Sequence, residues 1–339
     1  MHKSLLFKPL DDEFIQCQVC QRRCKIGPGK NGFCKTRKNV NGELYSLIYG
    51  KVSSIRVSPI EIKPLFHFYP GSRWLSLGSL GCNFLCSGCQ NWEISHANVE
   101  KEIPFTEQIS PEKAVQLAIK ENCKGISWTY NEPTLWLEYT LDTAKIAKER
   151  GLLTNYVTNG YISPEAMDLL GPSLDAYRVD LKGFSPHTYK RIANIPDFEG
   201  VLKIIKMAKH QWGMHIEIIT NLTPGFNDDK QELCDTADWI VNQLGPDTPW
   251  HITRFVPHFK LSHLDYTPIP KLEQARQIGM DKGLRYVYLG NVPGHLAENT
   301  YCPQCGKLLI ERRNYRILKY NLEGNRCSFC SKIIAGYFE

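Results

Sequence analysis

Long apolar runs, blocks of like charge and low-complexity tracts are all missing from this sequence of 339 residues. No segment approaches the roughly 18 consecutive apolar residues of a membrane-spanning helix. Residues 1–14 show no apolar stretch behind a basic start, as a secretory signal would. The formal net charge is +6, with the Lys and Arg residues scattered, so charge alone does not argue for nucleic-acid binding. We therefore expect a cytoplasmic protein without a membrane partner.

Cysteine, by contrast, is abundant. The chain has 13 cysteines, and most of them fall into three tight clusters. Neighbours two or three residues apart suit a shared metal better than structural disulfides, which usually join distant elements of secreted proteins. The clusters are Cys17, Cys20, Cys24 and Cys34; Cys82, Cys86 and Cys89; and Cys302, Cys305, Cys327 and Cys330. Cys123 and Cys234 lie outside them and are interpreted as inert thiols.

Between the outer clusters, short β-rich runs alternate with helical stretches, the pattern of repeated βα units around a parallel sheet. Strands are predicted at 74–79, 125–130, 153–158, 176–181, 215–221, 251–256 and 285–289. Ser110, Ser163 and Ser185 each precede a proline and predict helix starts, because serine caps a helix and proline suits its first turn. No Gly-x-Gly-x-x-Gly follows the first strand, which disfavours a doubly wound sheet.

The sequence therefore predicts an α/β protein built on a partial (β/α) barrel at 72–291. Small Cys-rich modules are predicted on either side, at 1–71 and 292–339. In such a barrel the active residues lie at the carboxyl ends of the strands. We accordingly expect the functional side chains in the loops that follow the predicted strands.

The middle cluster, Cys82, Cys86 and Cys89, follows the first predicted strand with the spacing Cys-x3-Cys-x2-Cys. Three thiolates can ligate three irons of a 4Fe-4S cubane and leave the fourth iron without a protein ligand. That open iron can chelate the amino and carboxylate groups of S-adenosylmethionine (SAM), so that an electron from the cluster breaks the bond from the sulfonium to C5′. A zinc site completed by His67 or His96 is the alternative, although zinc sites favour paired Cys-x2-Cys half-sites.

This spacing, directly after a first barrel strand, resembles the signature of the radical SAM superfamily. The resemblance implies a partial (β/α) barrel of the radical SAM type, with a 4Fe-4S cluster and SAM as cofactors, and an enzyme with radical chemistry of the oxidoreductase or lyase type. Its reaction would cleave SAM reductively to methionine and a 5′-deoxyadenosyl radical that abstracts hydrogen from a substrate that the sequence does not identify. One position departs from the pattern, because the residue before the third cysteine is often aromatic in the superfamily and is Gly88 here.

Segments at the later strand ends resemble the activating enzymes for pyruvate formate-lyase, and this resemblance implies roles for six residues. Asn131, Glu132, Asn159 and Arg254 are predicted to bind SAM, and Asp180 and Lys182 are predicted to be catalytic. In the matching segment the acidic residue binds the SAM ammonium group, a role that falls to Glu132, whereas Asn131 replaces a glycine. Asp180 and Lys182 are two residues apart on a strand, so their side chains point to the same face.

The outer clusters predict metal-organised modules. Cys302, Cys305, Cys327 and Cys330 form two Cys-x2-Cys knuckles on either side of a strand-like run, which is typical of a structural zinc ribbon. The four N-terminal cysteines are spaced less regularly. Zinc is the favoured interpretation for that site too, and a second, fully ligated 4Fe-4S cluster that relays electrons is the alternative.

The resemblance also narrows to one branch. Residues 63–72, 90–92, 288–294 and 300–303 are similar to the radical SAM component of the AmmeMemoRadiSam system, which implies a Memo-like protein and an AMME-type protein as partners. An electron donor such as flavodoxin or ferredoxin is a further expected partner.

Two alternative functions remain open from the sequence. The resemblance to the activating enzymes for pyruvate formate-lyase leaves one alternative function, that of an activase that installs a glycyl radical on a partner protein. From another class, the C-terminal module is a candidate nucleic-acid-binding element. Its basic and aromatic residues are Arg312, Arg313, Tyr315 and Arg316, a composition that some nucleic-acid-binding zinc ribbons share. A scaffolding role for the module is favoured.

Overall fold

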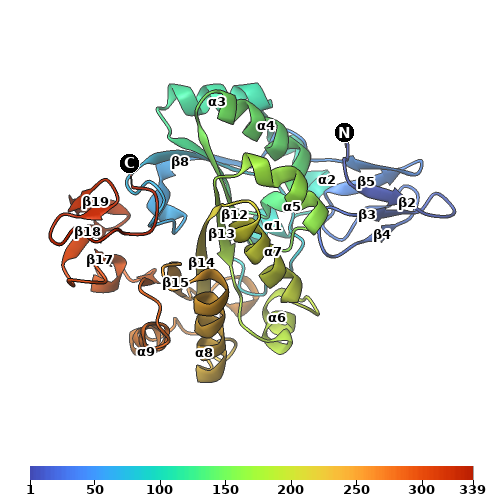
Figure 1. Ribbon diagram of the computed structural model, residues 1–339. Helices are drawn as coiled ribbons and strands as arrows, with labels where there is room; N and C mark the ends of the chain where they lie inside the picture. Colours follow the sequence, from blue (N-terminus) through green and yellow to red (C-terminus); the bar gives the residue numbers. More distant parts are fainter. Residues whose placement is uncertain (339) are drawn as a thin grey trace. The chain divides into compact units, whose positions relative to one another are not determined.

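A computed structural model describes residues 1–338 of the chain. The chain divides into two units, which are described one at a time. The first contains Met1–Ser58, Arg73–Tyr177 and Glu199–Met214, and the second contains Pro59–Ser72, Arg178–Phe198 and His215–Glu339. Figure 1 labels many of the helices and strands of both units.

The N-terminal part of the first unit consists of small antiparallel sheets. Their strands are β1 (His2–Lys3), β6 (Glu43–Ser46) and β5 (Arg37–Val40) in one sheet; β2 (Phe7–Pro9), β3 (Ile15–Cys17) and β4 (Lys25–Ile26) in a second; and β7 (Lys51–Val52) with β10 (Glu107–Gln108) in a third. The turn from β3 to β4 is closed by a hydrogen bond from the Cys17 amide to the Cys24 carbonyl. The four N-terminal cysteines are therefore carried by strand ends and tight turns.

The rest of the first unit is built from helices and mainly parallel strands. The strand order is β12 (Leu153–Thr158), β11 (Gly125–Trp128), β9 (Arg73–Gly78) and β8 (Ser54–Pro59). The helices are α1 (Trp92–Ser95), α2 (Val99–Glu102), α3 (Pro111–Lys120), α4 (Leu137–Glu149), α5 (Pro164–Leu170) and α7 (Glu199–His210). All four residues of β11 are buried, as expected for a parallel strand covered on both faces.

The second unit continues the βα alternation. Strand β13 (Ala176–Asp180) ends in it, and β14 (His215–Leu222), β15 (Trp250–Arg254) and β16 (Val287–Gly290) pair in parallel. The intervening helices are α6 (Pro186–Ala193), α8 (Lys230–Trp239) and α9 (Ile269–Asp281). Because these strands are parallel, the side chains at their carboxyl ends lie at the same edge of the sheet.

The C-terminal module is also part of the second unit. It contains the antiparallel sheet β17 (Thr300–Tyr301), β18 (Leu308–Arg313) and β19 (Arg316–Tyr320), and the short pair β20 (Leu322–Glu323) and β21 (Arg326–Cys327). Its apolar core includes Leu309, Ile310 and Phe338, and extends to Phe66 and to Tyr288 of β16. The module is thus packed onto residues outside 292–339, and does not rely on its own interior alone.

The predicted fold class is confirmed. All seven predicted barrel strands exist, with ends shifted by at most a few residues. Ser110, Ser163 and Ser185 cap α3, α5 and α6, and each side chain accepts a hydrogen bond from the backbone amide three residues later. Local capping chemistry therefore sets where these helices begin. No helix within residues 1–338 has both the length and the apolar character to cross a membrane.

A buried carboxylate, Glu217 of β14, organises the centre of the second unit. It accepts hydrogen bonds from the backbone amides of Phe66 and His67 and from the rings of His215 and His251. The imidazole of His67 is fully buried and bonds to the Ala335 carbonyl and the Tyr288 hydroxyl. Burial lowers the pKa of His67 to about 4, so His67 is neutral in the folded protein at neutral pH.

We predict that acid destabilises the second unit through His67. Because its folded pKa lies below the unfolded value of 6.5, the stabilisation is present above about pH 6.5 and is lost as the pH falls towards about 4. The free energy of unfolding should drop by about 2 kcal/mol between about pH 7 and pH 5 from this residue alone. Urea unfolding at both pH values measures the loss. His67→Gln keeps two hydrogen-bonding atoms but does not titrate, and it should reduce the loss; an equal pH dependence in that variant would contradict the assignment.

Candidate functional site

The loop that carries Cys82 follows β9 and is shaped by Gly81. This glycine has a φ of +83°, and a Cβ on it would lie 2.5 Å from Thr36 Cγ2 and 2.8 Å from the Cys34 carbonyl oxygen. Its amide donates to the Ile94 carbonyl at 2.8 Å. Only glycine combines a positive φ with so close an approach. The N-terminal cysteine segment therefore lies directly against the start of the Cys82 loop.

Three half-buried thiols project from this loop, those of Cys82, Cys86 and Cys89. The Phe84 amide donates to Cys82 Sγ at 3.3 Å, and the Cys89 amide donates to the Cys86 carbonyl at 3.3 Å. Burial raises the pKa of the Cys82 thiol, and the Glu132 carboxylate raises it further. A thiolate at this position therefore needs a compensating positive charge, as a bound metal provides.

Asn131 positions the loop through its side chain. Its Oδ1 accepts from the Ser79 amide at 2.9 Å, and its Nδ2 donates to the Gly81 carbonyl at 3.0 Å. The amide thus bridges the end of β9 and the residue before Cys82, which a glycine at this position could not do. The predicted SAM contact of Asn131 stays a prediction, and its observed partners give it a positioning role.

Glu132 is buried and fully engaged within the first unit. One carboxylate oxygen accepts from the Thr134 amide and the Thr158 hydroxyl, and the other accepts from the Asn159 amide at 2.8 Å. Burial raises the pKa of Glu132, although these hydrogen bonds oppose the shift. The carboxylate ties the loop after β11 to the end of β12. Its predicted contact with the SAM ammonium group stays a prediction.

Asn159 reaches the cysteine loop, as expected for a residue at a strand end. Its Nδ2 donates to Asn83 Oδ1 at 2.8 Å and lies 3.7 Å from Cys82 Sγ. Asn83 is fully buried, and its own Nδ2 has no hydrogen-bond partner among the described residues. A buried donor without a partner is costly, so this amide points to a bound group as its acceptor. Sequence reasoning missed Asn83, because no motif distinguishes it from a spacer residue between two cysteines.

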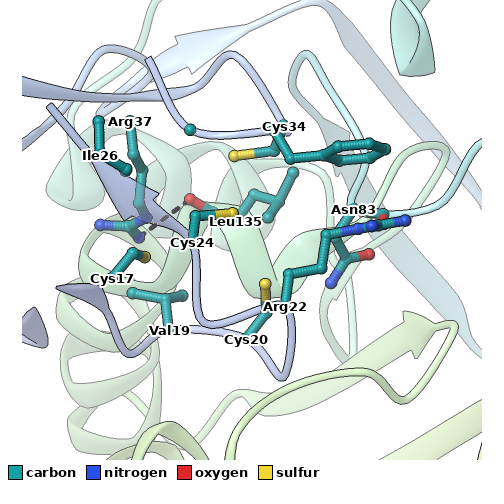
Figure 2. A pocket seen from close by; sticks show the side chains of 12 residues that line it. Cys17, Val19, Cys20, Arg22, Cys24, Ile26, Cys34, Arg37, Asn83 and Leu135 are labelled. Atoms are coloured by element: carbon teal, nitrogen blue, oxygen red, sulfur yellow. Dashed lines mark hydrogen bonds between the residues drawn. The ribbon is translucent and has the colours of Figure 1, made fainter. Parts of the chain in front are cut away.

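All four N-terminal cysteines line one pocket of the first unit (Figure 2). Arg22, Arg37, Phe33, Asn83 and Leu135 are among its other lining residues. Arg22 Nε donates to the Asn83 carbonyl, and the Arg37 guanidinium makes a bidentate ion pair with the buried carboxylate of Glu138. The pocket is therefore both sulfur-rich and bordered by two cations, and it adjoins the Cys82 loop through Asn83.

Asp180 and Lys182 lie at the end of β13 in the second unit. Asp180 Oδ2 is 3.6 Å from Lys182 Nζ and 3.0 Å from Arg178 Nη1. Burial alone would raise the pKa of Asp180, but the charges of Arg178 and Lys182 lower it below its usual value. Arg178 and Asp180 are two residues apart on β13 and share one face of it. Lys182 lies beyond the end of the strand, and it contacts the same Asp180 carboxylate. Sequence reasoning did not single out Arg178, although it lies two residues before Asp180 and therefore on the same face of β13.

Arg254 lies at the end of β15, also in the second unit. Its Nε donates to the Thr267 carbonyl at 2.9 Å, and its guanidinium lies over the ring of Tyr266. Its backbone carbonyl accepts from the side chains of Asn221 and Asn291. These contacts fix the direction of the side chain, while the predicted role of Arg254 in binding SAM stays a prediction.

The C-terminal cysteines form a compact group. The Sγ atoms of Cys302, Cys305, Cys327 and Cys330 all lie within 4.8 Å of one another. The pairs Cys302–Cys330 and Cys305–Cys327 are 3.6 and 3.8 Å apart. A tetrahedral ion with bonds of about 2.3 Å places its sulfurs about 3.8 Å apart. This group could therefore hold one metal ion.

One of the basic residues considered for nucleic-acid binding faces inward. Arg312 is buried and donates to the Phe66 carbonyl at 2.9 Å and to the Thr300 hydroxyl at 2.7 Å. Its guanidinium also lies over the ring of Phe66. Arg312 therefore fastens the C-terminal module to residue 66 and does not contribute to an exposed basic surface.

Comparison with known proteins places this cysteine loop in a family. The model of the Radical SAM superfamily matches residues 77–240, which include the loop and the strand ends after β11 and β12. Residues 77–240 of the chain form a radical SAM domain. An uncharacterized protein of Methanocaldococcus jannaschii is 44% identical over 336 residues, which is 98% of this chain and 99% of that protein.

More distant radical SAM relatives include activating enzymes. A pyruvate formate-lyase-activating enzyme of Clostridium pasteurianum is 24% identical over 216 residues, covering 60% of this chain and 87% of that enzyme. Among solved structures, a radical SAM methyltransferase from Sphaerobacter thermophilus has a TM-score of 0.50 at 14% identity, over 71% of each chain. The first comparison shows distant homology to activating enzymes, and the second supports the α/β fold of the superfamily.

Proposed function

We propose that the chain is a cytoplasmic radical SAM enzyme in which Cys82, Cys86 and Cys89 hold a 4Fe-4S cluster. The loop geometry supports this proposal most directly. Gly81 and Asn131 fix the loop at the end of β9, and three thiols project from it without a fourth cysteine in the same loop. Three protein ligands leave one iron of the cubane open, which is the arrangement that SAM chelation requires.

The residues present suit such a group. Cys82 Sγ already accepts the Phe84 amide and lies near the Asn159 amide, and hydrogen bonds to cluster sulfurs tune the reduction potential. When bound, the reduced cluster supplies one electron that cleaves SAM to methionine and a 5′-deoxyadenosyl radical. The chain contributes the fixed loop, held in place by Asn131 and Glu132. Asp180, Lys182 and Arg254 are proposed to orient SAM through their charges.

The direct test is a cleavage assay with anaerobically reconstituted protein, dithionite and SAM. We expect 5′-deoxyadenosine and methionine to form even without a substrate, because uncoupled cleavage needs only an electron and the open iron. Iron content and colour accompany the assay. A protein that binds zinc in place of iron at the Cys82 loop and cleaves no SAM would contradict the proposal.

We predict that Lys182→Ala leaves the iron content unchanged but weakens SAM binding. Loss of one charge-assisted contact should cost about 1.5 to 3 kcal/mol, or roughly tenfold or more in affinity. Asp180→Ala should have an effect of similar size, because it also leaves the buried Arg178 without its carboxylate partner. Equilibrium binding of SAM to the reconstituted variants measures both.

Lys190→Ala provides the matched control, since Lys190 is an exposed lysine of α6 and should leave SAM affinity unchanged. If Lys182→Ala and Asp180→Ala bind and cleave SAM like the parent enzyme, the pair has only a structural role.

The partners of the enzyme are proposed from its resemblances to known families. Similarity to the radical SAM component of the AmmeMemoRadiSam system suggests Memo-like and AMME-type partners, with flavodoxin or ferredoxin as electron donor. Distant homology to activating enzymes supports the alternative of an activase that forms a glycyl radical on a partner protein. A glycyl radical detected on a co-purified partner would favour the activase, whereas stable association with Memo-like and AMME-type proteins would favour the first interpretation.

The C-terminal cysteine group is proposed to bind zinc as a structural ion. The short sulfur distances support a single tetrahedral ion, and zinc is the metal that four thiolates commonly hold in this geometry. The inward direction of Arg312 supports a scaffolding role over nucleic-acid binding.

A further inference from the structure

We infer that Cys17, Cys20, Cys24 and Cys34 hold a second 4Fe-4S cluster, which passes electrons to the cluster on the Cys82 loop. The site itself stands on the geometry of the N-terminal pocket. Its role as a relay rests on the proposed function. Three features of the pocket support the inference: the spacing of its sulfurs, its unpartnered donors and its position beside the Cys82 loop.

Sulfur spacing separates the two kinds of site. The C-terminal cysteines have sulfurs paired at 3.6 and 3.8 Å, which suits one tetrahedral ion. Among the described residues, the N-terminal four form no such compact group of sulfurs, although all four line one pocket. The three cysteines of the Cys82 loop likewise form no such compact group. Wider spacing is expected where each thiolate ligates a different iron of a cubane, so the N-terminal four resemble the cluster loop and differ from the zinc-like group.

Two buried donors of the pocket lack acceptors among the described residues. They are Asn83 Nδ2 and Arg37 Nε, and both side chains are almost fully buried. The other guanidinium nitrogens of Arg37 are used by Glu138, Ser4 and the Leu135 carbonyl. Buried donors normally have partners. A cubane offers inorganic sulfides and thiolate sulfurs as acceptors for both donors.

The pocket adjoins the Cys82 loop within the first unit (Figure 2). Asn83 lines the pocket and is also the residue that follows Cys82, and its Oδ1 lies 3.9 Å from Cys82 Sγ. On the other side of Cys82, Gly81 is held against the Cys34 carbonyl. The residues on both sides of Cys82 thus contact the N-terminal cysteine segment or its pocket, which provides a short path for an electron.

The electron transfer balances without a bond change. A reduced protein donor of the flavodoxin or ferredoxin class loses one electron and is oxidised. The N-terminal cluster takes up that electron and is reduced, and it is then reoxidised as it reduces the cluster on Cys82, Cys86 and Cys89. No proton or leaving group is involved.

The decisive experiment leaves the N-terminal site intact. The full chain with Cys82, Cys86 and Cys89 all changed to alanine is reconstituted anaerobically with iron and sulfide, and its iron, sulfide and zinc are measured. We expect roughly four iron and four sulfide per chain to remain. A chain without iron that carries a second zinc, or one with roughly two iron and two sulfide, would overturn the assignment. This result does not depend on SAM cleavage, so it is distinguishable from failure of the proposed function.

Changing Cys20 and Cys24 to alanine in the same triple variant should remove the remaining iron. Cys234→Ala in that background is the matched control, because Cys234 lies in α8 outside every cluster, and it should keep the iron. If the Cys20 and Cys24 changes prevent folding, Asn83→Leu gives a second measurement. It removes one unpartnered donor, so the remaining cluster should keep its iron but show a more negative reduction potential. An unchanged potential would contradict the hydrogen bond from Asn83.

Electron paramagnetic resonance tests the relay. In the triple variant, reduced ferredoxin should reduce the remaining cluster and give a paramagnetic signal. In the unchanged chain, the two reduced clusters should broaden each other's signals, because they lie close together. A cluster that ferredoxin cannot reduce, or a spectrum equal to the sum of two isolated clusters, would overturn the relay.

Discussion

Changing Cys86 to alanine is expected to abolish SAM cleavage. The loop would lose one of three iron ligands, and a cubane held by two thiolates does not keep the single open iron that binds SAM. The loop itself should survive the change, because the backbone of Gly81 and the side chain of Asn131 fix its start through contacts that do not involve Cys86. Formation of 5′-deoxyadenosine by the anaerobically reconstituted variant should fall to the background of free iron, sulfide and dithionite.

Cys234→Ala is the control for this experiment. It also removes one thiol, from α8, and should leave the cleavage rate and iron content as they are in the parent. Circular dichroism shows whether Cys86→Ala retains its secondary structure. Undiminished cleavage by a folded Cys86→Ala protein would mean that the Cys82 loop is not the cluster site, and the proposed function would fail with it.

Much of the fold could be predicted because local rules fix it. A serine before a proline defines each of three helix starts, and those capping hydrogen bonds are present. A parallel strand is covered on both faces and therefore has a largely apolar sequence. The run Gly125–Trp128 has this pattern, and it forms a buried strand. The strand ends then indicate which loops to search. Within those loops the resemblance to the activating enzymes pointed to Asn131, Glu132 and Asn159, and all three lie at or near the cysteine loop.

The contacts of these residues could not be predicted from their spacing. Glu132 looked available to a cationic ligand, yet three hydrogen bonds from its own unit engage it. Asn83 carries no motif, and its importance lies in an amide that tertiary packing leaves without a partner. Cysteine spacing likewise predicts the ligands of the proposed N-terminal site but not the distances between their sulfurs. Those distances are set by how β3, β4 and the later turns pack together.

The C-terminal module provides the second large expected effect. Changing Cys302 and Cys305 together to alanine should remove roughly one zinc per chain, because two of the four tetrahedral ligands are lost. Binding of structural zinc contributes on the order of 10 kcal/mol to small modules, and Cys302 is itself buried in the local core. The turns around Cys305 and Cys330 should therefore open and become sensitive to protease.

Loss of the zinc should not unfold the whole second unit. The core of the module continues into Phe66 and Tyr288, and Arg312 donates to the Phe66 carbonyl. These contacts do not involve zinc, so β18 should stay protected while the cysteine turns are cleaved.

Uncoupled SAM cleavage should persist, since no ligand of the Cys82 loop is changed. Turnover with the true substrate should fail if the module contacts that substrate. Elemental analysis, limited proteolysis and the cleavage assay on one preparation separate these outcomes. Unchanged zinc content would exclude the structural-zinc interpretation, and loss of uncoupled cleavage with the iron intact would instead give the module a role in SAM binding.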